Sequence, residues 1–541
     1  MTKVTNNENM RRYVHMALAK QASQAAGGGL SPEEVEAMIN QALEEYSEAE
    51  LQKAIDNDYF VLDPGEDQYA YGVLIDFTEG KSSPDLKRIG NMELHRTLPV
   101  QSQYKGCIWD YMNQEIVYYL NPENWNLAVN DEVHNVQKTA EEVATDMIHL
   151  AYDIRVETPK FYASSKVLAT DGAGHTTMAK VMFSTIKLNA SYIEIPRQVT
   201  DFRPCRYDNS VTECLVCNLN EYDVVGGYAT TKNTDLGCQS SLYYPITNWD
   251  REHARQAAHN ANTNLMCYEY YKWLFYWAFV IEYATLNSHK PVNNELDENG
   301  FHQGGLGGGL TNFVENNGIS LQDTTGKDKC RYIGVTNELG NGTGELSVPT
   351  DTGLAKTGHP NRYRGFECPF GDITLMLDGF LGVPVLNGDG MAFYDYYSCC
   401  NPEYFADDIP LPWDTDNDYS TEISNQWTKI ARYQDLTTTD IYDGDEGDGL
   451  WMGYLTKYIS IGNRGELLPQ MWQNESEKYF VDSSTVKDKY GSQKAILHMG
   501  SSSGGSSSGL GCLDASSDPS YAENSLGFRC FNIIKDDGTV I

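Results

Sequence analysis

Residues 265–286 read LMCYEYYKWLFYWAFVIEYATL, and this stretch decides the fold. Apolar and aromatic side chains occupy nearly every position, so a helix formed here is hydrophobic around its whole circumference and must be buried. Aromatic residues at helical spacing pack in cores far more often than they line ligand sites, so we assign Trp273, Trp277 and Phe279 to the core. The longest uninterrupted apolar run, residues 273–281, is too short to cross a bilayer, so we expect no membrane insertion.

Two capping residues bracket the start of this helical block. Asp250 is a suitable N-cap for a helix over residues 251–260, and Asn264 is a suitable N-cap for the buried helix that follows. On the N-terminal side, a helix is predicted over residues 131–151. Short runs of β-branched and aromatic residues, bounded by Gly, Pro and Asn, predict strands at residues 69–77, 106–109 and 115–120.

The region after residue 364 is rich in Gly, Ser, Asp and Tyr and has few helical windows. This composition predicts long irregular loops on a scaffold of short strands. The fold class expected for the whole chain is therefore α+β, with a small β-rich region at residues 58–160 and a large loop-rich domain at residues 161–541.

Residues 1–57 form a separate N-terminal segment. SPEE at residues 31–34 is a capping box that opens a helix, and Val35, Ile39, Ala42 and Tyr46 then lie on one narrow stripe. Because this stripe is too narrow for burial in a large core, we expect the helix to associate with copies of itself, most simply as a homotrimer. The alternative is a surface helix packed on the following domain.

Length and charge exclude several classes of protein. A chain of 541 residues can bury a large core without disulfide or metal staples. Its formal net charge of −36 repels phosphate backbones, which disfavours nucleic-acid binding. The aromatic content of 11% is too high for a disordered acidic chain, and the 36 tyrosines are typical of recognition surfaces.

Two acidic loops are candidates for calcium. Asp414, Asp416 and Asp418 have the alternating oxygen ligands that open a calcium loop, but Tyr419 stands where an EF-hand requires glycine. The second loop has a dense set of carboxylates at Asp443, Asp445 and Asp448. Either loop could surround a hard cation, and the alternative is that both are simply solvated. No other cofactor is expected.

Motifs for catalysis are weak. Cys214 and Cys217 form the only CxxC pair, so a structural zinc site is disfavoured. The sequence contains no Gly-x-Ser-x-Gly elbow, and its histidines are dispersed. We therefore expect a protein that is not an enzyme, although paired carboxylates of a glycoside hydrolase would be invisible at this level.

Several short motifs, taken together, resemble a known family. Five of them are RIGN at residues 88–91, LPVQS at 98–102, YLNP at 119–122, ETPKFY at 157–162 and YRGFECPFG at 363–371. This combination resembles fibre-type virion structural proteins of phages that infect gut Bacteroides-like hosts, the crAss-like phages. The closing segments, HMGSSS at 498–503 and LGFRC at 526–530, are similar to the last strands of the C-type-lectin-like fold that formylglycine-generating enzymes share with variable receptor-binding proteins of phages.

The resemblance covers residues 68–541 and implies a C-type-lectin-like domain in which two helices flank small twisted sheets. It implies that Phe528 fills the core and that Arg529 pairs with a neighbouring carboxylate. It also implies a place in the virion, on a head or tail fibre-like appendage, with the N-terminal helices attached to other capsid or tail proteins. The chain departs from the enzyme branch because its last two cysteines, Cys512 and Cys530, are not closely spaced.

The function expected from this resemblance is binding of a host cell-surface glycan or protein. Tyrosine on rigidly supported loops offers a large contact area at a low entropic cost. The candidate ligand-binding residues are Tyr394, Tyr396, Tyr397, Tyr521 and Asn524. The alternatives are tyrosines packed in the protein's own trimer interface, a glycan depolymerase on a fibre, and a decoration protein without a receptor.

Overall fold

The computed structural model describes most of the chain from Val61 onward. The described residues are 61–77, 85–110, 113–127, 129–143, 152–170, 176–204, 206–207, 222–225, 228–231, 244–245, 249–310, 336–349, 357–371, 374–386, 392–407, 427–432, 450–455, 459–461, 465, 467–469, 472–473, 483–487, 495–499, 508–522 and 526–541. The predicted N-terminal helix and the proposed segment 1–57 lie outside them.

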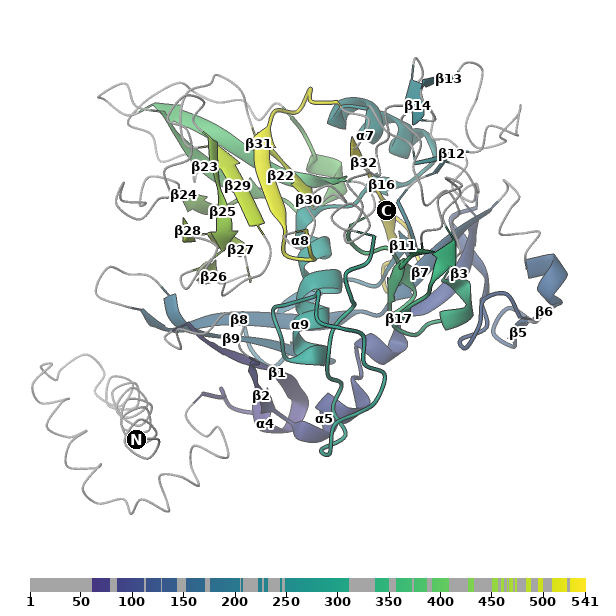
Figure 1. Ribbon diagram of the computed structural model, residues 1–541, viewed down its shortest axis with the longest axis horizontal. Helices are drawn as coiled ribbons and strands as arrows, with labels where there is room; N and C mark the ends of the chain where they lie inside the picture. Colours follow the sequence, from purple (N-terminus) through teal and green to yellow (C-terminus); the bar gives the residue numbers. More distant parts are fainter. Residues whose placement is uncertain are drawn as a thin grey trace, which may run out of the picture.

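A five-stranded antiparallel sheet forms one end of the molecule (Figure 1). Its order is β10 (Ile193–Ile195), β8 (Phe161–Thr170), β9 (Thr176–Ser184), β1 (Ala70–Asp76) and β2 (Lys87–Gly90). Short helices flank it: α4 (Glu66–Tyr69) before β1, then α5 (Met92–Thr97) and η1 (Gln101–Gln103) after β2. Asn91 caps α5, because its side chain accepts hydrogen bonds from the backbone of Glu93 and Leu94.

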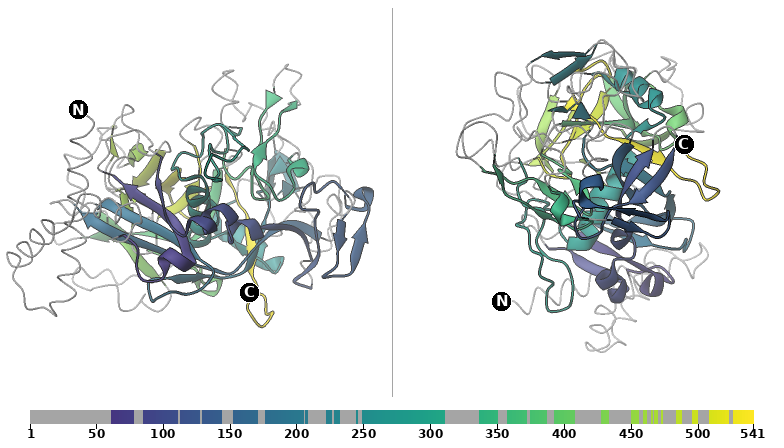
Figure 2. Two further views of the ribbon diagram at one scale, coloured as in Figure 1. Left: turned by 90° about the horizontal axis from the view of Figure 1, so that it is seen from below. Right: turned by 90° about the vertical axis from the view of Figure 1, so that its right-hand side faces the viewer.

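A six-stranded antiparallel sheet joins residues from both ends of the sequence. Its order is β16 (Asn264–Leu265), β33 (Cys530–Ile533), β11 (Gln198–Asp201), β7 (Tyr152–Thr158), β3 (Lys105–Asp110) and β4 (Glu115–Tyr119). The hairpin of β5 (Val129–Asp131) and β6 (Val136–Lys138) follows β4. Figures 1 and 2 show this hairpin at the end of the molecule opposite to the β8–β9 pair.

The largest sheet is built from the C-terminal third of the chain. Its order is β24 (Thr428–Arg432), β23 (Ala392–Ser398), β22 (Thr374–Leu386), β30 (Ala495–Met499), β31 (Leu513–Ser517), β29 (Ser483–Lys487), β25 (Leu450–Leu455) and β28 (Trp472–Gln473). A ninth strand, β32 (Leu526–Gly527), pairs in parallel with β22.

The remaining described elements are small. They are the pairs β12 (Arg206–Tyr207) with β15 (Tyr244–Pro245), β13 (Tyr222–Val225) with β14 (Tyr228–Thr231), β18 (Val348–Pro349) with β19 (Thr357–Gly358), and β26 (Ile459–Ile461) with β27 (Leu467–Pro469), the three-stranded sheet of β17 (Gly344–Glu345), β20 (Asn361–Tyr363) and β21 (Phe366–Glu367), and the 3-10 turns η3 (Asn337–Leu339) and η4 (Pro402–Tyr404).

Two helical blocks pack between these sheets. The first is α7 (Arg251–Asn260), whose bounds agree with the prediction: the Asp250 side chain caps it by accepting a hydrogen bond from the His253 backbone. The second is a continuous helix made of α8 (Tyr268–Tyr271), the π-helical stretch η2 (Lys272–Trp277) and α9 (Ala278–Tyr283). It begins later than predicted, because Asn264 is not a cap but pairs in β16 with β33.

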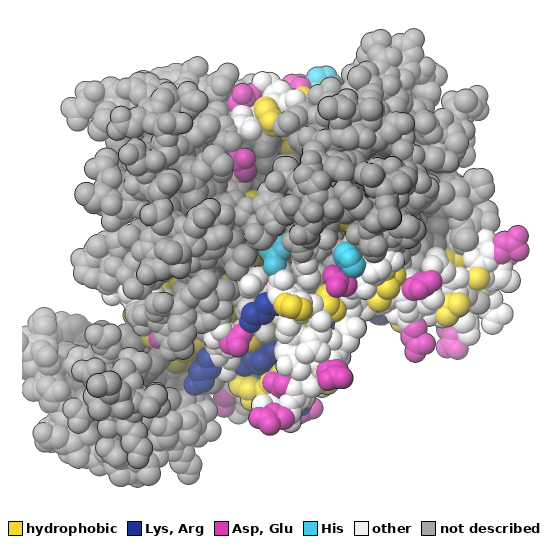
Figure 3. Space-filling model, viewed as in Figure 1, with side chains coloured by type: hydrophobic (Ala, Val, Ile, Leu, Met, Phe, Trp, Pro, Cys, Tyr) yellow, Lys and Arg dark blue, Asp and Glu magenta, His cyan; other side chains and the backbone are white. Residues whose placement is uncertain are grey.

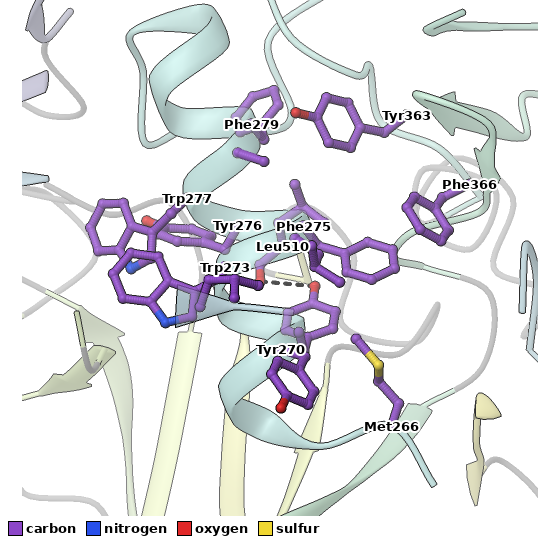
Figure 4. Close-up of a cluster of buried hydrophobic side chains, with 14 of the residues drawn as sticks. Met266, Tyr270, Trp273, Phe275, Tyr276, Trp277, Phe279, Tyr363, Phe366 and Leu510 are labelled. Atoms are coloured by element: carbon purple, nitrogen blue, oxygen red, sulfur yellow. Dashed lines mark hydrogen bonds between the residues drawn. The ribbon is translucent and has the colours of Figure 1, made fainter. Parts of the chain in front are cut away.

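This second helix is the centre of the hydrophobic core (Figure 4). Trp273, Trp277 and Phe279 are fully buried, as predicted. The Trp277 indole Nε1 donates a hydrogen bond to the Gly465 carbonyl oxygen at 2.9 Å, so its polar atom is satisfied. One cluster of buried side chains extends from β1 through this helix to β33.

The structure corrects two predictions. Of the helix predicted over residues 131–151, residues 131–138 instead form part of the β5–β6 hairpin, because the Asp131 carboxylate caps the tight turn by accepting hydrogen bonds from the Val133 and His134 backbone. Residues 140–143 are helical, as predicted, and residues 144–151 lie outside the described part of the chain. A domain boundary at residue 160 would cut through two sheets and the common core, since β1 pairs with β9 and β7 pairs with β11. The coarser expectation of a mixed, β-rich α+β chain with few helices is confirmed.

Candidate functional site

The structure places two of the predicted ligand-binding tyrosines in the core. Tyr396 and Tyr397 are neighbours in β23 and are only 0% and 1% exposed. Side chains of consecutive strand residues point to opposite faces, so both faces of β23 are covered here. The ring of Tyr396 stacks on that of Phe380 at 5.4 Å. The prediction that these two tyrosines are presented to an external ligand is therefore wrong.

The other predicted residues fall into two groups. Tyr521 is described and is 37% exposed, as a ligand-binding residue must be. The side chain of Tyr394, the residue Asn524 and the six candidate calcium ligands (Asp414, Asp416, Asp418, Asp443, Asp445 and Asp448) lie outside the described part of the chain. Within the described part, no group of three or more His, Cys, Asp or Glu side chains is arranged to hold a metal ion.

Tyr521 lies in a turn that packs at the start of α7. The Asp518 carboxylate accepts a hydrogen bond from the Ser520 backbone at 2.9 Å, and the Tyr521 backbone donates to the Asp518 carbonyl oxygen at 3.0 Å. The Arg251 backbone donates to the Pro519 carbonyl oxygen at 3.2 Å. Beneath this turn Trp249 packs on Phe528, so the turn rests on a rigid base.

Two arginines one helical turn apart connect α7 to the rest of the molecule. Arg255 forms a bidentate ion pair with the buried Asp378 of β22. The distances are 2.7 Å from Nε to Oδ2 and 2.9 Å from Nη2 to Oδ1. Asp407 accepts from Arg255 at 3.1 Å and from the Nε of Arg251 at 2.6 Å. Arg251 also donates to the Phe380 carbonyl oxygen at 2.7 Å.

The charges in this group hold one another in the ionised form. Burial alone would raise the pKa of Asp407, but attraction to Arg251 and Arg255 outweighs it and lowers the pKa below its usual value. For Arg255, burial would lower the pKa, whereas Asp378 and Asp407 raise it. Two cations and two anions balance, so the group fixes α7 in place without creating a strong local field.

The result is a mixed polar and aromatic surface, which we call the α7 surface: Asp250, His253, Arg255, Asp407 and Tyr521. His253 is exposed, and its Nδ1 lies 2.7 Å from the Asp250 carboxylate. Asp407 and Arg255 are in contact with each other and are partly exposed. An amphipathic ring next to preoriented donors and acceptors can bind a ligand that has both apolar and hydroxyl-rich faces.

Glu367 and Arg529, two buried charged residues in the sequence motifs, form hydrogen bonds that stabilise the fold. Glu367 accepts a hydrogen bond from Arg203 at 2.9 Å and two more from Thr336, all within the core. Arg529 donates hydrogen bonds to the carbonyl oxygens of Asp201, Glu367 and Cys368. Phe528 is buried, as expected. These motif residues hold segments that are far apart in the sequence together.

One serine–histidine contact has the elements of a nucleophile and a base. Ser347 Oγ lies 3.2 Å from Nδ1 of His359, and both residues are exposed. Within the described residues, no carboxylate contacts His359 to orient the ring or to stabilise its charged form. This pair therefore lacks the third member that activates a serine nucleophile.

Basic side chains gather on one face of the molecule, over the region of β2 and α5 (Figure 3). Carboxylates neutralise several of them: Lys290 pairs with Asp85, Arg96 with Glu93, and Arg364 with Glu282. This face therefore does not offer an unpaired basic strip of the kind that tracks a phosphate backbone.

Sequence reasoning missed Arg251, Arg255, Asp378 and Asp407. A usable signal existed for the first two, because they are four residues apart on a well-capped helix whose other inward positions are alanines. Asp378 and Asp407 lie in segments without any periodic pattern, and only the tertiary fold brings them to α7. Comparison with protein-family models and with curated proteins finds no match to this chain.

No helix among the described residues is long and apolar enough to cross a membrane.

Proposed function

We propose that this chain is a non-enzymatic structural protein of a bacteriophage virion, a head or tail fibre-like appendage that binds a host cell-surface ligand. The proposal includes a C-type-lectin-like body and N-terminal helices that form a homotrimer and attach to other virion proteins. The proposal rests on the resemblance of the short sequence motifs, such as LPVQS at 98–102 and YRGFECPFG at 363–371, to those of phage fibre-type proteins. The structural support is that residues of these motifs, such as Glu367 and Arg529, hold the scaffold together, as expected of a shared fold.

The lectin-like part of the proposal is supported by the arrangement of the helices. The helix α7 and the continuous helix α8–α9 flank small antiparallel sheets, and the last strand, β33, lies inside the six-stranded sheet beside β11 and β16. The family implies such an arrangement, with irregular loops emerging from a compact body.

The α7 surface is the proposed place of ligand contact. It contains the exposed Tyr521 and the partly exposed Asp407 and Arg255; Asp407 and Arg255 take part in ion pairs with the buried Arg251 and Asp378. A host glycan matches this chemistry, because sugar rings present apolar faces that stack on tyrosine and hydroxyls that bind carboxylates and guanidinium groups. Several copies per virion would raise the avidity of individually weak contacts.

The test compares two variants of the whole chain in a binding assay on host cells. Tyr521→Ala should reduce labelling of host cells at least tenfold without changing the melting temperature. Leu127→Ala removes a comparably exposed apolar side chain near the β5–β6 hairpin and should bind normally. Equal labelling by the parent and by Tyr521→Ala would remove the α7 surface from the proposal.

The glycan depolymerase on a fibre is the alternative that needs its own assay. Incubation with isolated capsular polysaccharide should leave its chain length unchanged if the protein only binds. Shortened polysaccharide would replace the binding function with the depolymerase. Failure both to label host cells and to compete with phage adsorption would favour a decoration protein.

A further inference from the structure

A buried lysine of the five-stranded sheet contacts three oxygen atoms that come from one short, distant segment. Lys180 lies in β9, and its side chain is only 1% exposed. Its Nζ donates to the Val61 carbonyl oxygen at 3.0 Å, to Asp63 Oδ2 at 3.1 Å, and to Glu66 Oε2. A buried ammonium group has lost its hydration, so this ion-pair clamp on residues 61–66 replaces water as its set of hydrogen-bond partners.

Glu66 is the more deeply buried of the two carboxylates in the clamp. Its side chain is fully buried, whereas that of Asp63 is 16% exposed. Glu66 Oε1 accepts a hydrogen bond from the Tyr192 hydroxyl at 2.9 Å, and Oε2 accepts one from the Asp63 backbone at 2.7 Å as well as the contact from Lys180. The carboxylate is therefore held in one orientation between Lys180 and residue 63, where it can transfer protons between them.

A second lysine holds the carboxylate of Asp63. Lys166 of β8 is directly opposite Lys180 in the β8–β9 pair, an arrangement of like charges that is unfavourable by itself. Its Nζ lies 2.8 Å from both oxygens of Asp63. The two lysines and the two carboxylates balance in charge. A cation in contact with both oxygens also stabilises the negative charge that develops on them when the carboxyl carbon is attacked.

The surroundings of Asp63 select Lys180 as the attacking amine. Asp63 is followed by Pro64, whose backbone nitrogen has no hydrogen and cannot attack the aspartyl side chain. Among the contacts that the described residues form, Glu66 touches Lys180 but not Lys166. The side chain of Lys166 is also 35% exposed, so it stays hydrated as a cation. Lys180 is therefore the lysine that has both a base and an electrophile within contact.

We propose that Lys180 and Asp63 join in an intramolecular amide bond, an isopeptide bond that the folded chain forms by itself. Glu66 takes a proton from Nζ of Lys180, and the amine attacks Cγ of Asp63 while Lys166 stabilises the oxyanion. The Nζ–Cγ bond forms, one Cγ–O bond breaks, and Glu66 passes protons to the departing oxygen. One ammonium and one carboxylate give one amide and one water, so the step needs no other reactant.

The fold favours this reaction in two ways. Contact between the reacting groups replaces a collision and corresponds to an effective molarity on the order of 10⁵ M or more for well-aligned groups. The amide is also uncharged, so its formation removes one buried ion pair and the desolvation cost of that pair. The bond closes a loop from residue 63 to residue 180 and fixes residues 61–66 covalently to β9. It does not depend on ligand binding at the α7 surface.

The intact mass of the full chain in denaturing solvent tests the bond, because ion pairs do not survive there. The parent should be lighter than its sequence by one water, about 18 Da. Glu66→Gln keeps the shape of the side chain but cannot take a proton, and Lys180→Arg removes the amine, so both should have the full mass. Lys160→Arg is the matched control: Lys160 pairs with Asp536 at 2.5 Å, but their side chains are 33% and 79% exposed, so this variant should keep the loss.

Peptide mapping locates the bond. Trypsin does not cleave after an acylated lysine, so peptide 167–187 should be joined to the peptide that contains Asp63, and fragmentation should place the bond at Lys180. Near-ultraviolet circular dichroism checks that the variants are folded. A parent chain at its full mass would overturn the proposal whatever the variants do, and so would a bond that fragmentation places at Lys166 or Glu66.

Discussion

At the scale of single residues, Arg155 is held between two buried carboxylates in neighbouring strands. Its Nε lies 3.1 Å from Asp153 and 3.2 Å from Asp201. Burial and the charge of Asp201 raise the pKa of Asp153 well above its usual value, although Arg155 opposes the shift. Asp201 also accepts a hydrogen bond from the Cys530 backbone at 2.7 Å, which ties the C-terminal strand to the sheet.

The different surroundings of these two carboxyl groups predict losses of different size for the same substitution. Asp153→Asn replaces a carboxyl whose charged form is disfavoured by burial with an amide of similar shape, and it should cost less than about 1 kcal/mol of unfolding free energy at pH 7. Asp201→Asn removes the charge that balances the buried Arg155 and should cost about 3 kcal/mol. Urea unfolding of both variants measures the two losses, and equal losses would contradict this difference between the two carboxyl groups.

A buried histidine predicts a pH dependence of stability. His95 contacts the Ile89 carbonyl oxygen through Nε2 at 3.0 Å, and burial lowers its pKa to about 4 from 6.5. The unfolded chain therefore binds a proton near pH 6.5 that the folded chain does not accept until about pH 4, so stability is full above this window and falls as the pH drops through it.

The expected slope is about 1 kcal/mol per pH unit between pH 6 and pH 5. His95→Gln should remove this part of the slope, although it lowers stability at pH 7. Urea unfolding at these pH values provides the measurement. A His95→Gln chain with the same pH slope as the parent would show that this histidine titrates normally in the folded state.

The two tyrosines of β23 show where prediction fails at this scale. Tyr396 and Tyr397 follow Tyr394 in a Tyr-rich run that is typical of a binding loop, and nothing in the run itself tells whether one or both faces of a strand are covered. Burial of these side chains depends on what packs against the two faces of β23, such as Phe380 of β22 against Tyr396, and the run itself does not contain this information.

At the scale of elements, the strands predicted at residues 69–77, 106–109 and 115–120 agree with β1, β3 and β4 to within one residue at each end, and among the helices α7 was predicted best. The bounds of α7 follow from the Asp250 cap, because a local hydrogen bond decides them. The start of the buried helix depended on a tertiary contact: Asn264 had the propensity to cap, but pairing of β16 with β33 moved the start to Tyr268. The β5–β6 hairpin was missed for a different, local reason: the Asp131 carboxylate caps its turn, and helical propensity is a weak prior over a short polar segment.

The buried helix should be the element that tolerates substitution least. Trp277→Ala removes a fully buried indole and its hydrogen bond to Gly465, and we expect a loss of about 3–5 kcal/mol of unfolding free energy. Thermal unfolding of the variant gives the value. Leu296→Ala, at an exposed position, should melt within a degree or two of the parent, and a Trp277→Ala chain that melted equally well would place this helix outside the core.

At the scale of the whole molecule, composition and charge predicted a large folded chain with mixed structure but not its connectivity. The six-stranded sheet places β33, at the end of the chain, beside β11 and β16. Tertiary packing alone selects strand pairs between distant segments. A domain boundary at residue 160 therefore looked reasonable from composition, but strand pairs cross it in two sheets. The α7 surface has the same origin: Tyr521, Arg255 and Asp407 come from three distant segments.

Deletion of residues 1–57 tests the assembly at this scale. The clamp of Lys180 on residues 61–66 remains, so the body should unfold cooperatively at nearly the same temperature as the full chain. The mass from light scattering at micromolar concentration should fall to that of one chain, because the proposal assigns the main contact between copies to the N-terminal helix. A trimer that persists without residues 1–57 would transfer the oligomeric contact to the body.

Imaging of the virion tests the central claim most directly. An antibody against the folded chain, visualised by electron microscopy on intact phage particles, should label appendages that project from the particle surface. Fab fragments of the same antibody should block adsorption to host cells. Virions without any label, in a preparation where the antibody recognises the purified chain, would contradict the proposal that this protein is a fibre-like component of the particle.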